Sequence, residues 1–303
     1  MRRFLLGLAV LAVVAAACAP EEDEAPPADD GATATEPAPV DAATCAADAG
    51  TISDGVLTVG TGNPAFPPWW EGGTTDANAD WEFNDPHLLE GFEGATVGAV
   101  AEQLGFAPDA IHFVPVPFNK SFAPGPKDFD FVLQQISYSD KRAEAVDFSE
   151  SYYDVNQALV SVKGSDIDGA TTLAELQSAK LGAPLGTTSF DYIEQNIQPS
   201  EEPAVYNDLN GAVQALKNGQ VDGIVVDLPT AFFVTAVQIP KGVIVGQFPT
   251  VGAQEYFALA LEKDSALTEC LDLALQALKD DGTLPAIQQE WLADNASAPV
   301  IEG

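Results

Sequence analysis

The sequence predicts an α/β fold, because short runs of β-branched residues alternate with segments of helical periodicity along residues 51–292. Strands that alternate with helices tend to pair in parallel and to carry the helices on their faces, so parallel sheets are expected. The pattern occurs in two blocks, and a body of this length suits one large or two modest domains. We therefore expect two lobes joined by extended crossings, residues 51–157 with 256–296 and residues 158–255, followed by a tail at 297–303.

The N-terminal residues predict export. Arg2 and Arg3 precede a short apolar run that ends at Ala17 and is too short to span a membrane, so residues 1–17 are expected to be a signal peptide. Cys18 follows three alanines in a pattern similar to the bacterial lipobox, which predicts lipidation of Cys18 and an anchor on the extracellular face of the cell membrane. An ordinary signal peptide next to an incidental cysteine is the alternative.

Residues 18–50 are predicted to be a disordered acidic linker rich in Pro and Ala. Residues 19–50 include nine acidic residues, five prolines and no basic residue, with almost no large apolar side chain for a core to bury. The whole chain has a formal net charge of −34, which argues against nucleic acid or an anionic membrane surface as a partner.

The first block begins with a strand, a helix and a second strand. Residues 56–59 form a β-branched run, residues 95–104 have apolar residues at helical spacing before Gly105, and residues 111–116 alternate as a strand does. His112 lies inside the alternating strand, and neither it nor His87 has a recognisable partner, so no chemical role is assigned to either.

The second block continues the alternation. Thr172, followed by Glu175 three residues later, is typical of the N-terminus of a helix. The further elements expected are a strand at 180–185, a helix from Ser189, a helix at 210–217, a strand at 221–226 and two last helices, 265–279 and 284–292. The two last helices are expected to return to the first lobe.

Two cysteines remain after Cys18. In an oxidising compartment Cys45 and Cys270 favour a disulfide over a metal or redox site, and neither has a CxxC neighbour. A reactive thiol is the alternative. The sequence contains no nucleophile elbow, phosphate loop or metal-spaced cluster, so neither a metal nor a cofactor is expected.

Several short motifs follow one another in the order and spacing of one family, and the similarity covers about Gly55 to Leu292. The motifs are residues 57–61, Phe66-Pro67-Pro68-Trp69, 91–93, 139–142, 146–149, Tyr152-Tyr153, 186–189, 219–222 and Asp227. Together they resemble the family 3 extracellular solute-binding proteins, the polar amino-acid receptors of ABC importers. The resemblance implies a type II periplasmic-binding-protein-like fold, hinged, with an amino acid bound in the cleft between lobes. It also implies permease subunits in the membrane as partners, and a monomer.

The resemblance assigns the ligand's α-carboxylate to Arg142, with Ser137 as a second donor. Arg142 is the only arginine beyond Arg2 and Arg3, and its planar guanidinium suits bidentate contact with a carboxylate. A surface salt bridge is the alternative for Arg142.

The resemblance assigns the ligand's α-amino group to Asp227. This residue follows an apolar strand and is therefore expected at the carboxyl end of the strand, where open α/β sheets bind ligands. Thr187, Thr188 and Ser189 stand where a strand passes into a helix, so their N–H groups and hydroxyls are expected to face the ligand. Capping of a helix N-terminus is the alternative for Asp227 and for the hydroxyl residues.

The remaining candidates bear on the ligand side chain. The resemblance places Phe66 against it, and Phe118 could form the opposite wall, although aromatic residues at such positions can equally belong to the core. Gln134 and Gln135 stand where many members have small serines, and residues 62–64 lack the aspartate of receptors for cationic amino acids. These departures favour a polar ligand that is not strongly cationic. The insertion at residues 72–90 has no clear counterpart and could roof or narrow the cleft.

An enzyme of the same fold, a dehydratase acting on a small cyclic carboxylic acid, is the alternative to a binding protein. Asp222, Asp227, Glu150 and Glu71 could in principle supply paired carboxylates. No nucleophile or metal motif accompanies them, so the chain is expected not to be an enzyme.

Overall fold

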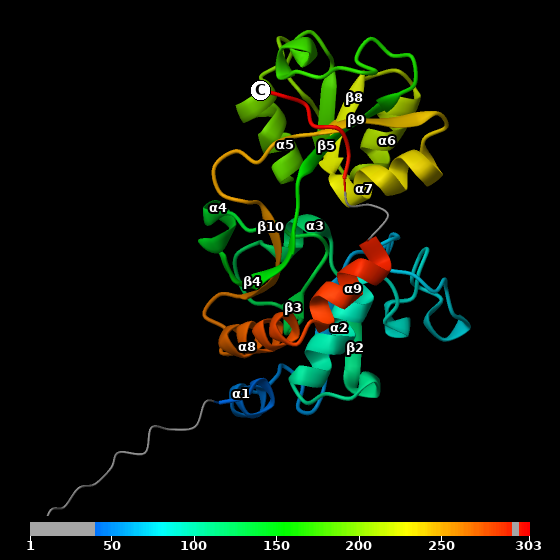
Figure 1. Cartoon of the computed structure of the whole chain (residues 1–303). Helices are drawn as coiled ribbons and strands as arrows, with labels where there is room; N and C mark the ends of the chain where they lie inside the picture. Colours follow the sequence, from blue (N-terminus) through cyan, green and yellow to red (C-terminus); the bar gives the residue numbers. More distant parts are fainter. Residues whose placement is uncertain (1–39, 293–296) are drawn as a thin grey trace, which may run out of the picture. The chain divides into compact units, whose positions relative to one another are not determined.

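The computed structural model describes residues 40–292 and 297–303. The predicted signal peptide, Cys18 and the predicted linker as far as residue 39 lie outside the described residues. Residues 40–303 form one compact unit that carries two five-stranded sheets, each with helices packed against it (Figure 1). The predicted two-lobed α/β architecture is therefore confirmed.

Lobe 1 contains the strands β1 (Leu57–Thr61), β2 (Ile111–Pro115), β3 (Phe131–Val132), β4 (Val146–Asp154) and β10 (Tyr256–Glu262). Their order in the sheet is β2-β1-β3-β10-β4. β1 pairs in parallel with β2 and β3, whereas β10 runs antiparallel to β3 and β4. All five residues of β1 are buried, as is typical of a strand whose two faces are both covered.

The helices of lobe 1 are α1 (Ala42–Ala49), α2 (Phe92–Gln103), α3 (Phe118–Ser121), α4 (Asp140–Ala143), α8 (Leu267–Asp280) and α9 (Thr283–Leu292). Three short 3-10 helices are Asp76–Asn78, Pro86–Leu88 and Pro108–Ala110. α2 begins after Gly91, whose φ is 87° and where an added Cβ would meet the carbonyl oxygen of Trp69 at 2.5 Å. α8 and α9 pack on lobe 1, as predicted for the two last helices.

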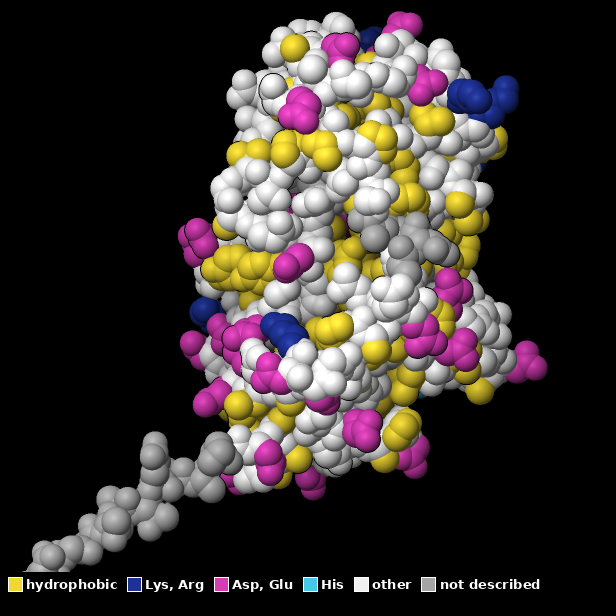
Figure 2. Space-filling model, viewed as in Figure 1, with side chains coloured by type: hydrophobic (Ala, Val, Ile, Leu, Met, Phe, Trp, Pro, Cys, Tyr) yellow, Lys and Arg dark blue, Asp and Glu magenta, His cyan; other side chains and the backbone are white. Residues whose placement is uncertain are grey.

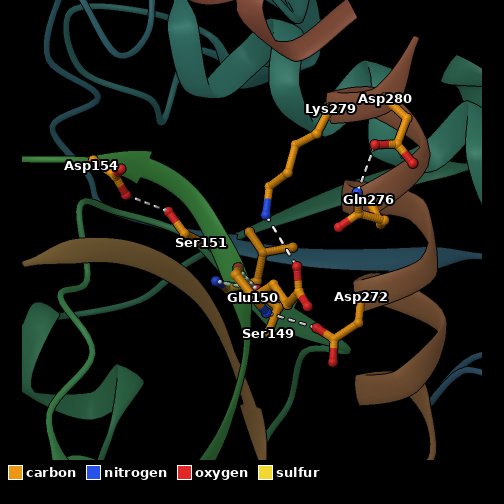
Figure 3. A network of polar contacts seen from close by, with 9 residues as sticks. Ser149, Glu150, Ser151, Asp154, Asp272, Gln276, Lys279 and Asp280 are labelled. Atoms are coloured by element: carbon orange, nitrogen blue, oxygen red, sulfur yellow. Dashed lines mark hydrogen bonds and ion pairs between the residues drawn. The ribbon is translucent and has the colours of Figure 1, made fainter. Parts of the chain in front are cut away.

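Polar contacts fix α8 on β4 in addition to the buried apolar face of the helix (Figure 3). The carboxylate of Asp272 on α8 accepts a hydrogen bond from the backbone N–H of Glu150 on β4, 2.7 Å away. Lys279 of the same helix pairs with the Glu150 side chain at 3.2 Å. These contacts help to hold α8 on the sheet of lobe 1.

Lobe 2 contains the strands β5 (Gln157–Val162), β6 (Leu181–Pro184), β7 (Ala204–Tyr206), β8 (Gly223–Asp227) and β9 (Gly242–Gln247). Their order is β7-β6-β8-β5-β9, with β6 parallel to β7 and β8 and with β5 antiparallel to β8 and β9. The helices are α5 (Thr188–Tyr192), α6 (Leu209–Lys217) and α7 (Leu228–Phe233), a 3-10 helix at Leu173–Leu176, and π-helical turns at Ile193–Ile197 and Val234–Gln238.

The expectation of parallel sheets holds only in part, because both sheets are mixed. The exceptions are strands that cross between the lobes: β5 follows β4 after two residues, and β10 returns the chain to lobe 1. A strand that arrives directly from the other lobe has no crossover helix to bring it in parallel, and such strands run antiparallel here. The helix expected from Thr172 is likewise only a 3-10 turn, although Thr172 and Glu175 form the expected capping box.

Two boundaries predicted from composition are corrected by the structure. The linker predicted to extend to residue 50 ends earlier, because α1 is a helix capped by the Asp41 side chain and joined by a disulfide from Cys45 to Cys270 on α8. The predicted tail belongs to lobe 2, since Ile301 is fully buried there. Its backbone N–H donates to the Gln247 carbonyl at 2.9 Å.

The surface reflects the composition. Figure 2 shows acidic side chains spread over the visible face with few basic ones among them. In the described part of the chain no helix combines the length and the apolar character that a membrane span requires.

Candidate ligand-binding site

A cavity of about 440 Å³ lies between the two lobes, with walls from both. It opens where β8 ends, where α5 begins and where the loop after β1 turns back. All ten residues that the sequence nominated for ligand contact line it: Phe66, Phe118, Gln134, Gln135, Ser137, Arg142, Thr187, Thr188, Ser189 and Asp227. The structure thus brings together residues that are up to 161 positions apart in the chain, from Phe66 to Asp227.

Arg142 lies on α4, and its side chain is only 8% exposed. One guanidinium nitrogen, Nη1, donates to the Ser137 carbonyl at 2.5 Å, and the other, Nη2, donates to the Gly186 carbonyl of lobe 2 at 2.8 Å. The guanidinium carbon lies 4.3 Å from the centre of the Phe122 ring and 5.6 Å from that of Phe118. A guanidinium has five N–H donors, so three remain for a ligand.

Burial lowers the pKa of Arg142, while the negative charges of Asp191, Glu255 and Asp227 act in the opposite direction. No salt bridge joins Arg142 to a carboxylate among the described residues. The surface salt bridge weighed for Arg142 is therefore not what the structure has. A buried arginine whose fixed partners are neutral is ready to receive an anion.

Ser137 connects three parts of the site. Its hydroxyl donates to Glu255 Oε1 at 2.7 Å and lies 3.3 Å from the hydroxyl of Thr188 on lobe 2. Its carbonyl is the acceptor for Arg142 described above. The Ser137 segment therefore places the arginine and also contacts lobe 2.

Asp227 stands at the end of β8 and at the N-cap position of α7, but its side chain makes no capping hydrogen bond. The carboxylate instead accepts a hydrogen bond from Gln157 Nε2 at 2.9 Å. Burial and, to a smaller extent, the charge of Glu255 raise the pKa of Asp227 to about 8, against the opposing effects of Gln157 and Arg142. The capping alternative is thus not observed for this side chain.

The three hydroxyl residues at the start of α5 contact different partners. Thr187 is the N-cap and accepts a hydrogen bond from the backbone N–H of Phe190 at 3.2 Å, so it has the structural role that was the alternative. Ser189 donates to Gln157 Oε1 at 2.7 Å. Thr188 lies next to Ser137 at the junction of the lobes.

The side-chain oxygen of Gln134 points toward the loop after β1. Its Nε2 donates to the Val116 carbonyl at 3.1 Å and to the Ser121 hydroxyl at 2.6 Å. A carbonyl can only accept, so the amide orientation is fixed and Oε1 faces Gly62, where it lies 2.9 Å from an added Cβ. The Thr61 hydroxyl on the same wall is buried without a hydrogen-bond partner among the described residues.

Gln135 donates hydrogen bonds to a buried acid, Glu93. It has a positive φ of 53°, and its backbone N–H and its Nε2 donate to the two oxygens of Glu93 at 2.8 and 2.6 Å. Tyr152 also donates to Glu93, at 2.6 Å. Burial raises the pKa of Glu93 to about 7, although the hydrogen bonds from Tyr152, Gln135 and Trp70 lower it. Glu93 thereby holds the segment that carries both glutamines.

The aromatic candidates occupy different surroundings. The Phe66 ring lies 5.0 Å from that of Phe83 and 5.9 Å from that of Phe233 on lobe 2, so it packs across the two lobes. Trp70 lines the cavity, whereas Trp69 packs on Phe92, Tyr153 and Phe257 in the core of lobe 1.

The insertion at residues 72–90 supports the cleft from outside. None of its residues lines the described cavity, so the expected roof is not observed. Asn84 Nδ2 instead donates to the carbonyls of Ala65 and Trp70 at 2.9 and 2.8 Å. His87 contacts Asp85 at 2.8 Å and Phe113 through its ring. The insertion therefore braces the loop that carries Phe66.

Sequence reasoning missed Gln157, Glu255 and Phe122. Gln157 and Glu255 lie on the segments that cross between the lobes, and Phe122 stacks on Arg142. A polar residue at the start of an apolar crossing strand, as Gln157 is in Gln157–Val162, is the signal that was available. Among the described residues no cluster of three or more His, Cys, Asp or Glu could hold a metal.

Known proteins resemble this chain in sequence. The family model for bacterial extracellular solute-binding proteins, family 3, matches residues 72–294. The arginine-binding extracellular protein ArtP of Bacillus subtilis (strain 168) is 26% identical over 223 residues, which cover 72% of this chain and 84% of ArtP. The L-cystine-binding protein TcyJ of Escherichia coli (strain K12) is 26% identical over 209 residues, which cover 68% of this chain and 76% of TcyJ.

Solved structures resemble it in fold. An ancestral arginine-binding protein bound to glutamine matches with a TM-score of 0.63 and 29% identity, over 79% of this chain and 98% of the other. The arginine-, lysine-, histidine-binding protein ArtJ from Geobacillus stearothermophilus matches with a TM-score of 0.64 and 21% identity, over 80% of this chain and 96% of the other. Fold and sequence agree, and the chain belongs to the bacterial extracellular solute-binding proteins, family 3.

Proposed function

We propose that this protein captures a free amino acid for an ABC importer. The observation that carries the proposal is that Arg142 and Asp227 line one cavity from opposite lobes. A guanidinium pairs with a carboxylate and an aspartate pairs with an ammonium, so the two residues match the two charged groups common to all free amino acids. Relatives named as arginine-binding and cystine-binding support the same class of ligand.

Capture works by closure of the two lobes. Arg142 and Ser137 hold the carboxylate from lobe 1, while Asp227, Thr188 and Ser189 reach the ligand from lobe 2. A ligand favours the closed form only through contacts that the open form lacks, and contacts to both lobes are of this kind. The hydrogen bond from Arg142 to the Gly186 carbonyl already joins the lobes beside the carboxylate site.

The walls of the cavity favour a polar amino acid that is not strongly cationic. Besides Arg142 and Asp227, the only charged residue among those lining the described cavity is Asp208. Asp208 is exposed and caps α6 by accepting from the Gly211 N–H at 2.8 Å. The side-chain region is therefore left to neutral groups, among which Gln134 Oε1 offers an acceptor for an amide or hydroxyl.

Like these relatives, which are named as binding proteins, the chain is a binding protein and not an enzyme. We further propose that Cys18 is lipidated after removal of residues 1–17, which would hold the protein on the extracellular face of the membrane near the permease subunits. We also propose that the protein is a monomer. Mass spectrometry of the mature N-terminus tests the anchor, and we expect it to show cleavage before Cys18 and a lipid on Cys18.

Thermal unfolding with a panel of amino acids tests the function. The chain without residues 1–18 is stripped of bound ligand by denaturation and refolding, and its unfolding midpoint is recorded with each common amino acid and L-cystine. A ligand at a thousand times its dissociation constant stabilises the folded state by about 4 kcal/mol. We expect a large upward shift for one or a few polar amino acids, and a smaller one for lysine and arginine.

A panel in which no amino acid raises the midpoint contradicts the proposal. A panel led by lysine or arginine keeps the amino-acid function and contradicts the neutral side-chain preference. Incubating the leading ligand with the protein and recovering it unchanged separates binding from turnover.

A further inference from the structure

A second carboxylate lies directly behind the amine side of the cleft. Glu255 precedes β10, on the segment that returns the chain to lobe 1, and it does not line the cavity. Its oxygens accept hydrogen bonds from Gln157 Nε2 at 3.0 and 3.2 Å, and the same nitrogen donates to Asp227 Oδ1 at 2.9 Å. One amide group thus bridges an acid at the end of β8 on lobe 2 and an acid on the segment that returns the chain to lobe 1.

The orientation of this bridging amide is fixed. The Ser189 hydroxyl donates to Gln157 Oε1 at 2.7 Å, which leaves the nitrogen for the carboxylates. Ser137 donates to Glu255 at 2.7 Å and so ties the second acid to the segment that places Arg142. Gln157 and Glu255 are therefore positioning residues that act through Asp227 and Ser137.

The positive charge near Asp227 is limited. Among the described residues Arg142 is the one cation that acts on Asp227, and its two assigned hydrogen bonds go to carbonyls. Two carboxylates that share a partially buried site do not both ionise readily, so a proton is retained. Several titratable or charged groups lie around Asp227 and Arg142 on the elements that pack there. They are Glu255, Tyr152, Tyr153, Asp191 and Asp208.

We propose that capture of the ligand's ammonium group releases a proton from Asp227, and that Glu255 sets the pH at which this exchange occurs. This inference rests on the proposed amino-acid function. In the exchange the protonated Asp227 carboxyl gives its proton to solvent, and the resulting carboxylate pairs with the incoming ammonium. No other bond forms or breaks. Glu255 acts by disfavouring a second negative charge in the empty cleft.

Proton linkage gives the exchange a measurable slope. The pKa of Asp227 is raised to about 8, so below that pH each unit of acidification weakens binding about tenfold. Between pH 8 and pH 6 the dissociation constant is expected to rise about 50-fold. Removing the Glu255 charge should lower the pH at which the proton is exchanged. The rise in the dissociation constant between pH 8 and pH 6 should then be less than tenfold.

The test is calorimetric titration of the full chain lacking only residues 1–18 with L-glutamine, whose side chain does not titrate in this range, or with the amino acid that the panel identifies. Titrations at pH 6, 7 and 8, each in two buffers that work at that pH and differ in ionisation enthalpy, give the number of protons released. We expect close to one proton released at pH 6 and a clearly smaller number at pH 8. Glutaramic acid, which lacks the α-amino group, is expected to release none.

Three variants assign the effect. Glu255→Gln removes the charge and is expected to flatten the pH dependence, whereas Glu255→Asp keeps the charge and is expected to retain it. Glu194→Gln, which changes an exposed acid on lobe 2 that does not line the cavity, should behave as wild type. Unfolding midpoints within a few degrees of wild type show that the variants are folded.

Binding with no proton release overturns the inference and leaves the amino-acid function intact. An unchanged pH dependence in folded Glu255→Gln overturns the role of Glu255. If no amino acid gives a binding signal at any pH, the proposed function fails, and this inference fails with it.

Discussion

The carboxylate side and the amine side of the cleft are built from different kinds of contact. Arg142 is held by two backbone carbonyls and two aromatic rings, none of which changes charge with pH. Asp227 is held by one amide that it shares with a second acid. The first arrangement fixes a permanent charge in place, whereas the second leaves the charge of Asp227 dependent on pH and on the ligand. The comparison predicts which changes weaken binding at every pH and which do so only at some.

Arg142→Ala is expected to have the largest effect on affinity. Truncating one partner of a buried, hydrogen-bonded charge pair costs about 2–5 kcal/mol, so affinity should fall by about 30-fold to a few thousand-fold. The fall should be no smaller at pH 6 than at pH 8, because the contacts of Arg142 do not titrate and its charge lowers the pKa of Asp227. Lys141→Ala, which changes the exposed neighbour, is the matched control. Calorimetric affinity within about twofold of wild type for Arg142→Ala contradicts the assignment.

Asp227→Asn is expected to come second and to show the contrast with Arg142. At pH 8 the wild-type carboxylate is partly ionised before binding, so the variant should bind about 100-fold more weakly. At pH 6 the wild type must first release a proton and binds about 50-fold more weakly than at pH 8, so the difference should shrink to roughly twofold. A deficit that is equal at both pH values would place Asp227 in the same class as Arg142.

Glu93 extends the comparison to stability, because it holds the segment of the two glutamines. Its pKa is about 7 in the folded state, above the ordinary value of 4.5 for a glutamate, so the folded state binds more protons between these values. The sign follows: this contribution is fully present below pH 4.5 and is lost as the pH rises through 7, by about 3 kcal/mol at most. Glu93→Gln should flatten this part of the profile of unfolding free energy. Glu102→Gln, an exposed acid on the same helix, should not.

Gln134→Leu is expected to change preference more than affinity. It removes the oxygen that lies next to Gly62 on the cavity wall at similar side-chain volume, so a ligand amide loses about one hydrogen bond, or 0.5–1.5 kcal/mol. The ratio of dissociation constants for L-glutamine and L-methionine should shift about fivefold toward methionine. An unchanged ratio shows that Gln134 does not contact the ligand side chain.

The disulfide should have the smallest effect on binding. Cys45 and Cys270 lie on α1 and α8, and neither lines the cavity. Cys45→Ser with Cys270→Ser should therefore leave affinity within about twofold while lowering the free energy of unfolding by about 2–5 kcal/mol. A thiol assay on denatured, unreduced wild type should find neither thiol reactive; two reactive thiols contradict the bridge.

What the sequence could predict depends on the kind of signal. Short motifs made some site residues predictable from the sequence. They mark Asp227 at a strand end and the segment from Gln134 to Arg142, and in the structure these predicted residues line one cavity. Gln157 and Glu255 carry no motif. Their role comes from distances between crossing segments that lie about 98 residues apart, and periodicity does not report such distances.

Composition misled at both ends of the folded unit. The segment around Ala42 to Ala49 has linker composition, yet it forms a helix, because Asp41 caps it and a covalent bond to Cys270 fixes it to a large core. Ile301 lies in a tail that is too short to give a periodic signal, but it fills a site in lobe 2. In both cases a contact with a distant element decides the structure, and the local sequence does not.

The most direct test of the pairing of Arg142 and Asp227 with one amino acid is the affinity of three matched ligands for the wild-type protein at pH 8. They are the amino acid that binds, its α-carboxamide and its deaminated analogue. We predict that each analogue binds at least about 30-fold more weakly, because each lacks the charged group that pairs with Arg142 or with Asp227. An analogue that binds as tightly as the parent amino acid would show that the corresponding residue does not hold the ligand.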